Sequence, residues 1–168
     1  MSFSETEIAI LKTIRNLTEN FYVECSGSIN LREQSYQIHH FGTRNSVPCP
    51  DAQYSFHTHP YPLTDAKKGW RFGGPPSNED YEISTYAQQI EYVITRGFVY
   101  RFDAADHAWD IEEILEKLQN EGGFYNYLGH ALEDGEISPE KFSAFVEIKF
   151  GLKVQVLYLG NLRDFRVD

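Results

Sequence analysis

The pattern of apolar and polar residues predicts a helix at the start of the chain. Ser4-Glu5-Thr6-Glu7 has the pattern of a capping box, in which a serine and a glutamate three positions later satisfy each other's backbone amides. Apolar residues then recur at helical spacing and are expected to face a core. The residues with this spacing are Ile10, Leu11, Ile14 and Leu17.

Strand-like alternation follows the helix. Residues 21–25 alternate with a period of two, which places Glu24 on the face opposite that of the odd-numbered residues. Segments 28–32 and 35–40 predict a hairpin with Glu33 at its turn. These short strands after a helix indicate an α/β fold class.

The second half of the chain alternates between helical and strand-like patterns. We expect it to complete a central mixed β-sheet flanked by helices, in one domain spanning residues 1–168. Residues 104–168, as C-terminal helices and a strand, would pack on a core of residues 1–103, either extending the same sheet or forming a small subdomain. The expected elements are a helix over 78–89, strands over 91–94 and 98–102 joined at Arg96-Gly97, helical segments over 109–118, 124–135 and 139–150, and a strand over 153–159.

The stretch Tyr54-Ser55-Phe56-His57-Thr58-His59-Pro60 carries the strongest chemical signal. Because successive strand side chains point to opposite faces, His57 and His59 share one face with Ser55. Two imidazoles at this spacing can bind one metal ion, with Zn–N bonds of about 2.0–2.1 Å. Pro60 cannot donate a backbone hydrogen bond and is expected to end the strand.

A carboxylate follows at the start of the next predicted helix. Ser77 has the character of an N-cap, and Asp80 stands at the third helical position. A strand that ends in two histidines and a helix that begins with an aspartate together supply three ligands. Zinc sites with three protein ligands keep a fourth position for water, as in catalytic sites. A surface histidine pair is the commoner meaning of His-x-His alone, but the ordered set favours a metal site.

His57-Thr58-His59-Pro60 and Ser77-Asn78-Glu79-Asp80 together resemble the JAMM signature of the JAB1/MPN/Mov34 metalloprotease superfamily, HxHP followed by SxxD. The resemblance covers about residues 5–103. The spacer from His59 to Asp80 is 21 positions (80 − 59), longer than in the common form of the motif, and it includes Lys67–Gly74. The resemblance implies an MPN/JAB-like sheet with the layering of cytidine deaminases.

The resemblance also implies a function. A zinc metallopeptidase of this family hydrolyses peptide or isopeptide bonds, often at the C-terminus of ubiquitin or a ubiquitin-like protein. His57, His59 and Asp80 would bind one Zn²⁺ per chain, Glu24 would be the general base, and the Ser77 hydroxyl would stabilise the oxyanion. Glu33 is the competing candidate for the base.

Two other functions remain open: a non-catalytic MPN-like scaffold, and another HxH metal hydrolase such as a phosphoesterase. The four other histidines show no clustering in the sequence that would supply a second metal site. The segment Tyr61–Pro76 is long for a connection and is either a substrate-contacting flap or a packed insertion.

The amino-acid composition limits which classes of partner and which compartment we expect. The formal net charge of −10, without a Lys/Arg run, disfavours nucleic acid and anionic membranes and is compatible with a polypeptide substrate. Cys25 and Cys49 are the only cysteines, which fits a reducing compartment such as the cytoplasm. No stretch is long and apolar enough to predict a membrane span.

Overall fold

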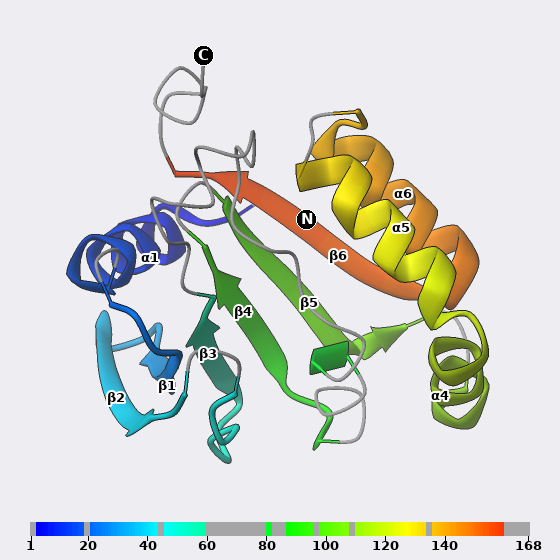
Figure 1. The fold of residues 1–168 in the computed structure, drawn as a ribbon. Coiled ribbons are helices and arrows are strands. Elements are labelled where there is room, and N and C mark those ends of the chain that lie inside the picture. Colours follow the sequence, from blue (N-terminus) through cyan, green and yellow to red (C-terminus); the bar gives the residue numbers. More distant parts are fainter. Residues whose placement is uncertain are drawn as a thin grey trace.

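The computed structural model describes residues 3–18, 21–43, 46–59, 80–81, 87–95, 98–107, 110–133 and 136–159. They form a six-stranded mixed sheet with helices on both faces, as predicted (Figure 1). The elements are α1 (Glu5–Thr18), β1 (Cys25–Asn30), β2 (Ser35–Phe41), β3 (Tyr54–Thr58), β4 (Ile90–Ile94), β5 (Phe98–His107), α4 (Ile111–Asn120), α5 (Gly122–Glu133), α6 (Pro139–Phe150) and β6 (Leu152–Tyr158).

The strand order across the sheet is β2-β1-β3-β4-β5-β6. β3 and β4 pair in parallel, and the other neighbouring strands pair antiparallel. The parallel register sets Ser55 opposite Glu91 and His57 opposite Val93. A parallel pair cannot be joined by a tight turn. The two strands are therefore joined by a longer connection, to which Asp80 belongs.

Helix α1 covers one face of the sheet. Its capping box forms as predicted: Ser4 Oγ accepts from the Glu7 amide at 3.1 Å, and Glu7 Oε1 accepts from the Ser4 amide at 3.0 Å. The apolar side chains of α1 pack on Phe56 of β3 and on strands to either side of it. The buried members of this packing from α1 are Ile10, Leu11 and Ile14.

The prediction that Leu17 faces the core is wrong, because its side chain is 48% exposed. The buried positions of α1 continue from Ile14 to Thr18, four residues later. A helix advances by about 3.6 residues per turn, so Thr18 lies in line with the inner face and Leu17 lies beside it.

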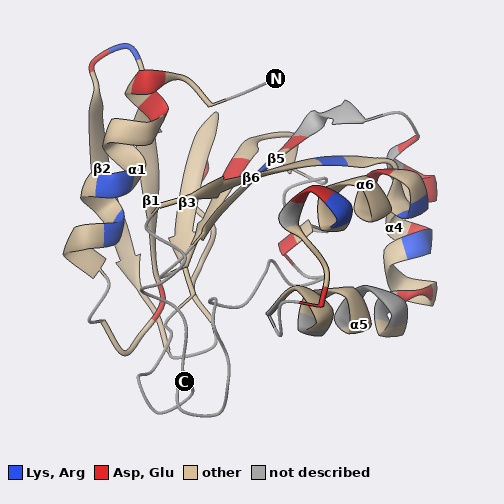
Figure 2. Ribbon diagram, turned by 90° about the horizontal axis from the view of Figure 1, so that it is seen from above, with Lys and Arg blue, Asp and Glu red and all other residues tan. Residues whose placement is uncertain are grey.

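Helices α4, α5 and α6 cover the opposite face, toward the β6 edge (Figures 1 and 2). Their apolar residues pack on Val93 of β4 and on residues of β5 and β6. Helix α6 has the predicted ends: Ser138 Oγ accepts from the Lys141 amide at 3.2 Å, and Gly151 takes the left-handed conformation with φ 69°. The C-terminal residues thus extend the same sheet through β6, which settles the alternative left open by the sequence.

The first strand begins later than the alternation of residues 21–25 predicts. β1 starts at Cys25, and residues 21–24 run irregularly before it. Glu24 is instead held by the chain after β2: its amide donates to Thr43 O at 2.8 Å, and its carbonyl accepts from the Gly42 amide at 2.8 Å. The predicted hairpin around Glu33 is present as β1 and β2.

Several expected features lie outside the described residues. They are the greater part of the helix over 78–89, the turn at Arg96-Gly97, Ser77, and the segment Tyr61–Pro76 with Lys67–Gly74 inside it. Among the helices that the structure describes, none has the length and apolar character required to cross a membrane.

Glu7 connects α1 to the sheet. Its carboxylate accepts hydrogen bonds at 2.5 Å from the Tyr92 hydroxyl of β4 and from Arg101 Nη1 of β5, two residues that are paired across the sheet. Burial alone would raise the pKa of Glu7, but the hydrogen bonds from Ser4, Tyr92 and Arg101 outweigh it, and the pKa lies below its usual value of 4.5. The contact therefore stabilises the fold when Glu7 is ionised.

We expect Glu7→Gln to lower the free energy of unfolding by about 1.5–3 kcal/mol at neutral pH, the range for hydrogen bonds to charged groups. Because the pKa is lower in the folded state, this stabilisation is present above the unfolded pKa and is lost as the pH falls through the folded pKa. Urea denaturation should therefore show the two proteins converging in acid. Glu5→Gln, at an exposed position of the same turn, is the control and should retain the wild-type acid slope.

Gly27 stands where β1 passes between β2 and Phe56, at an irregularity of the β1–β2 pairing. A Cβ atom there would lie 1.9 Å from the Gln37 carbonyl oxygen and 2.7 Å from the Phe56 ring. Gly27→Ala is expected to reduce the free energy of unfolding by about 1–3 kcal/mol, as overpacking does. Gly123→Ala is the matched control: its Cβ would meet nothing within 4 Å, and thermal unfolding should show no loss of stability. Equal effects at both positions would contradict this account.

Candidate metal centre

The two histidines of the His-Thr-His-Pro motif lie at the end of β3, on the face away from α1. The alternation predicted from the sequence is present: Phe56 packs with α1, whereas Ser55 and His57 are buried on the other face. His59 directly follows β3, and its amide donates to Ile94 O of β4 at 3.0 Å. This bond aligns the chain after β3 with the end of β4.

Asp80 reaches these histidines from the connection between β3 and β4. Its Oδ1 lies 3.3 Å from His57 Nε2, its Oδ2 lies 3.3 Å from His59 Nε2, and the two Nε2 atoms are 3.1 Å apart. Bonds of about 2.0–2.1 Å in a tetrahedral zinc site place neighbouring ligand atoms about 3.3–3.4 Å apart. The three side chains therefore have the mutual spacing of ligands around one ion of this size.

Glu24 completes the cluster from the segment before β1. Its side chain is buried at 5% exposure, and Oε1 lies 3.6 Å from His59 Nε2. Ligand atoms of Glu24, His57 and His59 all lie within 4.8 Å of one another, so these residues can hold a metal ion. Glu24 is thus placed either to bind the ion directly or to contact a water beside it.

Glu33, the other candidate for the base, lies away from the cluster. It is exposed in the turn between β1 and β2, where its amide donates to Asn30 Oδ1 at 3.0 Å. β1 runs antiparallel to β3, with Ser26 opposite His57 and Ser28 opposite Ser55. Each further residue along β1 moves about 3.3 Å from the histidines, so the turn is at the far end of the hairpin.

A carboxylate that the sequence analysis missed lies behind His57. Glu91 of β4 is 2% exposed, and its Oε1 is 2.6 Å from His57 Nδ1. Its other oxygen accepts from the Ser55 hydroxyl, which in turn accepts from Gln89 Nε2 at 2.9 Å. The available signal was a glutamate inside the otherwise apolar strand 90–94, since a buried carboxylate requires a partner.

The charges of the cluster alter one another's protonation. Burial disfavours the charged forms, but Asp80 and Glu91 outweigh it at His57 and hold the pKa of this imidazole well above its usual value. At Asp80 the same competition is decided by His57 and His59, and the pKa of the carboxyl lies well below 3.8. The cluster therefore holds negative charge that a cation, either protons on the imidazoles or a metal ion, neutralises.

The remaining candidate residues take no part in the described cluster. His39 and His40 are exposed on β2, and His39 Nε2 is hydrogen-bonded to Ser28 Oγ at 2.8 Å. Cys25 is buried, whereas Cys49 is exposed and contacts Gln89 Nε2 through its sulfur at 2.9 Å. Ser77 lies outside the described residues, so its predicted contact with the site stays a prediction.

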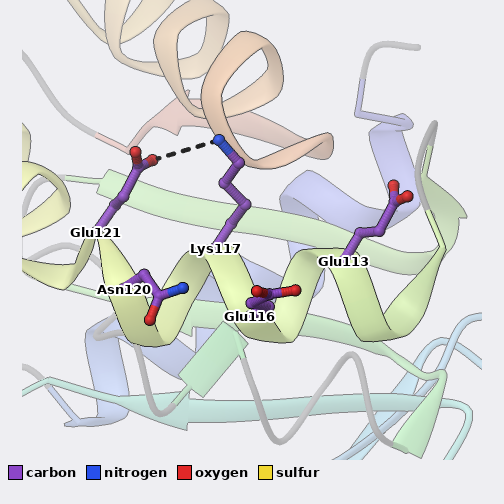
Figure 3. A pocket seen from close by; sticks show the side chains of 5 residues that line it. All are labelled: Glu113, Glu116, Lys117, Asn120 and Glu121. Carbon is purple, nitrogen blue, oxygen red and sulfur yellow. Dashed lines mark ion pairs between the residues drawn. The ribbon is translucent and has the colours of Figure 1, made fainter.

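A depression on α4 is separate from the cluster around His57. Figure 3 shows its lining side chains, with an ion pair of 3.9 Å between Lys117 and Glu121. Its other lining residues are Glu113, Glu116 and Asn120. None of them belongs to the cluster around His57.

The chain matches no family model, no curated protein and no solved structure.

We expect the purified protein to contain stoichiometric zinc, and His57→Ala, His59→Ala and Asp80→Ala each to lose it, because each removes one of three converging ligands. Inductively coupled plasma mass spectrometry of dialysed protein, scanned also for iron and manganese, measures the content. His39→Ala and His40→Ala, at exposed positions of β2, serve as controls and should retain the metal. Full metal retention in a variant lacking both His57 and His59 would refute the site.

Proposed function

We propose that this protein is a zinc-dependent hydrolase of the JAMM type that cleaves peptide or isopeptide bonds. The observation that carries the proposal is the position of the Glu24 carboxylate, 3.6 Å from one imidazole of a two-histidine, one-aspartate set. A structural zinc site uses four protein ligands, whereas hydrolytic sites combine three ligands with a nearby base. The four residues supply this combination.

The donor atoms fit zinc. Two imidazole nitrogens and one carboxylate oxygen form one of the ligand sets found in zinc hydrolases. A zinc ion bound there would act as a Lewis acid toward the scissile carbonyl and would lower the pKa of a coordinated water to about 7. His57, His59 and Asp80 would hold the ion.

Glu24 would take the proton from the attacking water on Oε1 and deliver it to the leaving amine. Burial raises the pKa of Glu24, and it does so against the opposing effect of the charges on His59 and His57. A carboxylate with a raised pKa is a stronger base at neutral pH than an exposed one. Ser77, three positions before Asp80, would donate a hydrogen bond from its hydroxyl to the developing oxyanion.

The bond type follows from the motif. HxHP and SxxD, with a glutamate upstream, are combined in a family whose substrates are peptide and isopeptide bonds, frequently at the C-terminus of ubiquitin-like proteins. We propose such a polypeptide as the substrate, in a cytoplasmic setting that fits the two free cysteines. The two other functions predict different metal contents: a dinuclear phosphoesterase would hold two ions per chain, and a scaffold would hold none.

The deciding experiment compares Glu24→Gln with wild type. If Glu24 is the base, the amide retains its shape but cannot accept the proton, and turnover should fall by about 10²–10⁴-fold. Zinc content and thermal stability should stay near wild type. Cleavage is measured with ubiquitin-like fusion proteins and with an unbiased peptide library, using zinc-loaded protein.

Glu33→Gln is the matched control, because it makes the same change at an exposed turn of the hairpin that follows Glu24. It should leave turnover unchanged. Loss of zinc in Glu24→Gln would identify Glu24 as a ligand and not as the base. Absence of zinc-dependent hydrolysis of any amide substrate by a wild-type protein that holds one zinc would reject the peptidase proposal.

A further inference from the structure

We infer that Glu91 is a positioning residue of the metal centre: it fixes the tautomer and the ring orientation of His57 and so sets the affinity for the ion. The inference rests on the metal-binding part of the proposed function and is independent of the bond that is cleaved. Glu91 lies behind His57, on the side away from His59 and Asp80, so it acts through the imidazole.

The direction of each hydrogen bond in this group follows from its chemistry. The Gln89 amide nitrogen can only donate, so Ser55 Oγ accepts from it at 2.9 Å. The Ser55 hydroxyl proton then points to Glu91 Oε2. Both oxygens of the carboxylate thus act as acceptors, one toward Ser55 and one toward His57.

The consequence for His57 concerns its two nitrogens. A carboxylate oxygen 2.6 Å from Nδ1 requires that Nδ1 carry the hydrogen. The neutral imidazole then has its lone pair on Nε2, the atom that faces His59 and Asp80. A metal ion binds this lone pair, so the contact with Glu91 prepares the ring for ligation.

Burial makes the contact specific. Ser55 is 0% and Glu91 is 2% exposed, and Gln89 is also buried, so water cannot replace a lost partner without rearrangement of the strands. In such surroundings a charged hydrogen bond is stronger than in water. The parallel register of β3 and β4 places Ser55 opposite Glu91, which makes the arrangement a property of the sheet.

His59 contacts the cluster through its own ring nitrogen. The structure assigns its Nε2 to the cluster as well, within 3.3 Å of Asp80 Oδ2 and 3.6 Å of Glu24 Oε1. Glu91 Oε1 contacts His57 at Nδ1, the nitrogen that points away from the cluster. We therefore expect the loss of Glu91 to lower the affinity for the ion through its effect on His57, while the contacts of His59 stay in place.

The test measures zinc affinity by competition with a chromophoric chelator. Partners that orient a metal-bound histidine typically contribute about 10–100-fold to affinity. Glu91→Leu should raise the dissociation constant for zinc by about this factor. Glu91→Gln keeps an oxygen that can accept from Nδ1 and should recover part of the loss. Ser55→Ala, which leaves the carboxylate in place but removes one donor to it, should have a smaller effect.

Two further readouts separate positioning from general damage to the fold. Long-range proton–nitrogen NMR of the zinc-loaded wild type should show His57 with its hydrogen on Nδ1, and this signal should be lost or exchange-broadened in Glu91→Leu. Glu7→Gln is the matched control: it neutralises another buried, hydrogen-bonded glutamate, on the α1 side of the sheet. It should lower stability without changing zinc affinity.

The outcomes distinguish this inference from the proposed function. Wild-type zinc affinity in both Glu91→Leu and Ser55→Ala would overturn the role of Glu91 and leave the metal site intact. An equal fall of zinc affinity in Glu7→Gln would show that the effect of the Glu91 variants is due to lost stability. This result would also overturn the role of Glu91. If Glu91→Leu does not fold, Ser55→Ala and Glu91→Gln still decide the question. A wild-type protein that binds no zinc would reject both.

Discussion

Parallel pairing of β3 with β4 is the constraint on which the rest of the molecule depends. It is the one parallel pair of the described sheet, and it joins the N-terminal hairpin to the C-terminal strands. Because parallel neighbours cannot be joined by a tight turn, the connection between His59 and Ile90 is long, and Asp80 belongs to it. Asp80 contacts both imidazoles although it stands 21 positions after His59 in the sequence.

The same pairing separates the two faces of the sheet by chemistry. Toward α1, Phe56, Tyr92 and Ile94 form a dry core with the helix. On the other face, Ser55, His57 and Glu91 form a buried polar group at one end, whereas Val93 joins the apolar packing of α4–α6. The sheet thus supports the cluster around His57, and apolar packing on both faces holds the strands in register.

Local patterns in the sequence were sufficient to predict features that depend on a single helix or strand. The two-residue period placed His57 and His59 on one face, and the capping signals at Ser4 and Ser138 marked true helix starts. They were insufficient where distant segments meet. The irregular path at Glu24 depends on bonds to Thr43 and Gly42, and the contact of Glu91 with His57 depends on a register between strands that no local pattern encodes.

The meeting of Glu24 and Asp80 with the two histidines was therefore predictable only from the order of the motif. That order anticipated the cluster of Glu24, His57, His59 and Asp80, although it carried no distances. The strand predicted over residues 21–25 began too early, since β1 starts at Cys25, but the prediction that Glu24 and Cys25 face opposite sides is confirmed: Cys25 packs in the core on the α1 side, and Glu24 contacts His59. The prediction that Leu17 faces the core was wrong for a related reason. The spacing of apolar residues alone does not show at which residue the buried side of a helix ends.

The contacts of α1 carry a consequence for the order of folding. Arg15 Nη2 donates to Leu159 O at 3.2 Å, a bond between residues 144 positions apart, and Glu7 is bonded to β4 and β5. The sheet is otherwise built largely from neighbours in sequence, which can pair as they emerge from the ribosome. Helix α1 precedes these strands in the chain, but its contacts are complete only after β6 and Leu159 have been synthesised. Before then the apolar residues of α1 can already pack on Phe56 and the strands beside it, so the contact of Arg15 with Leu159 is the part of the docking that is added late.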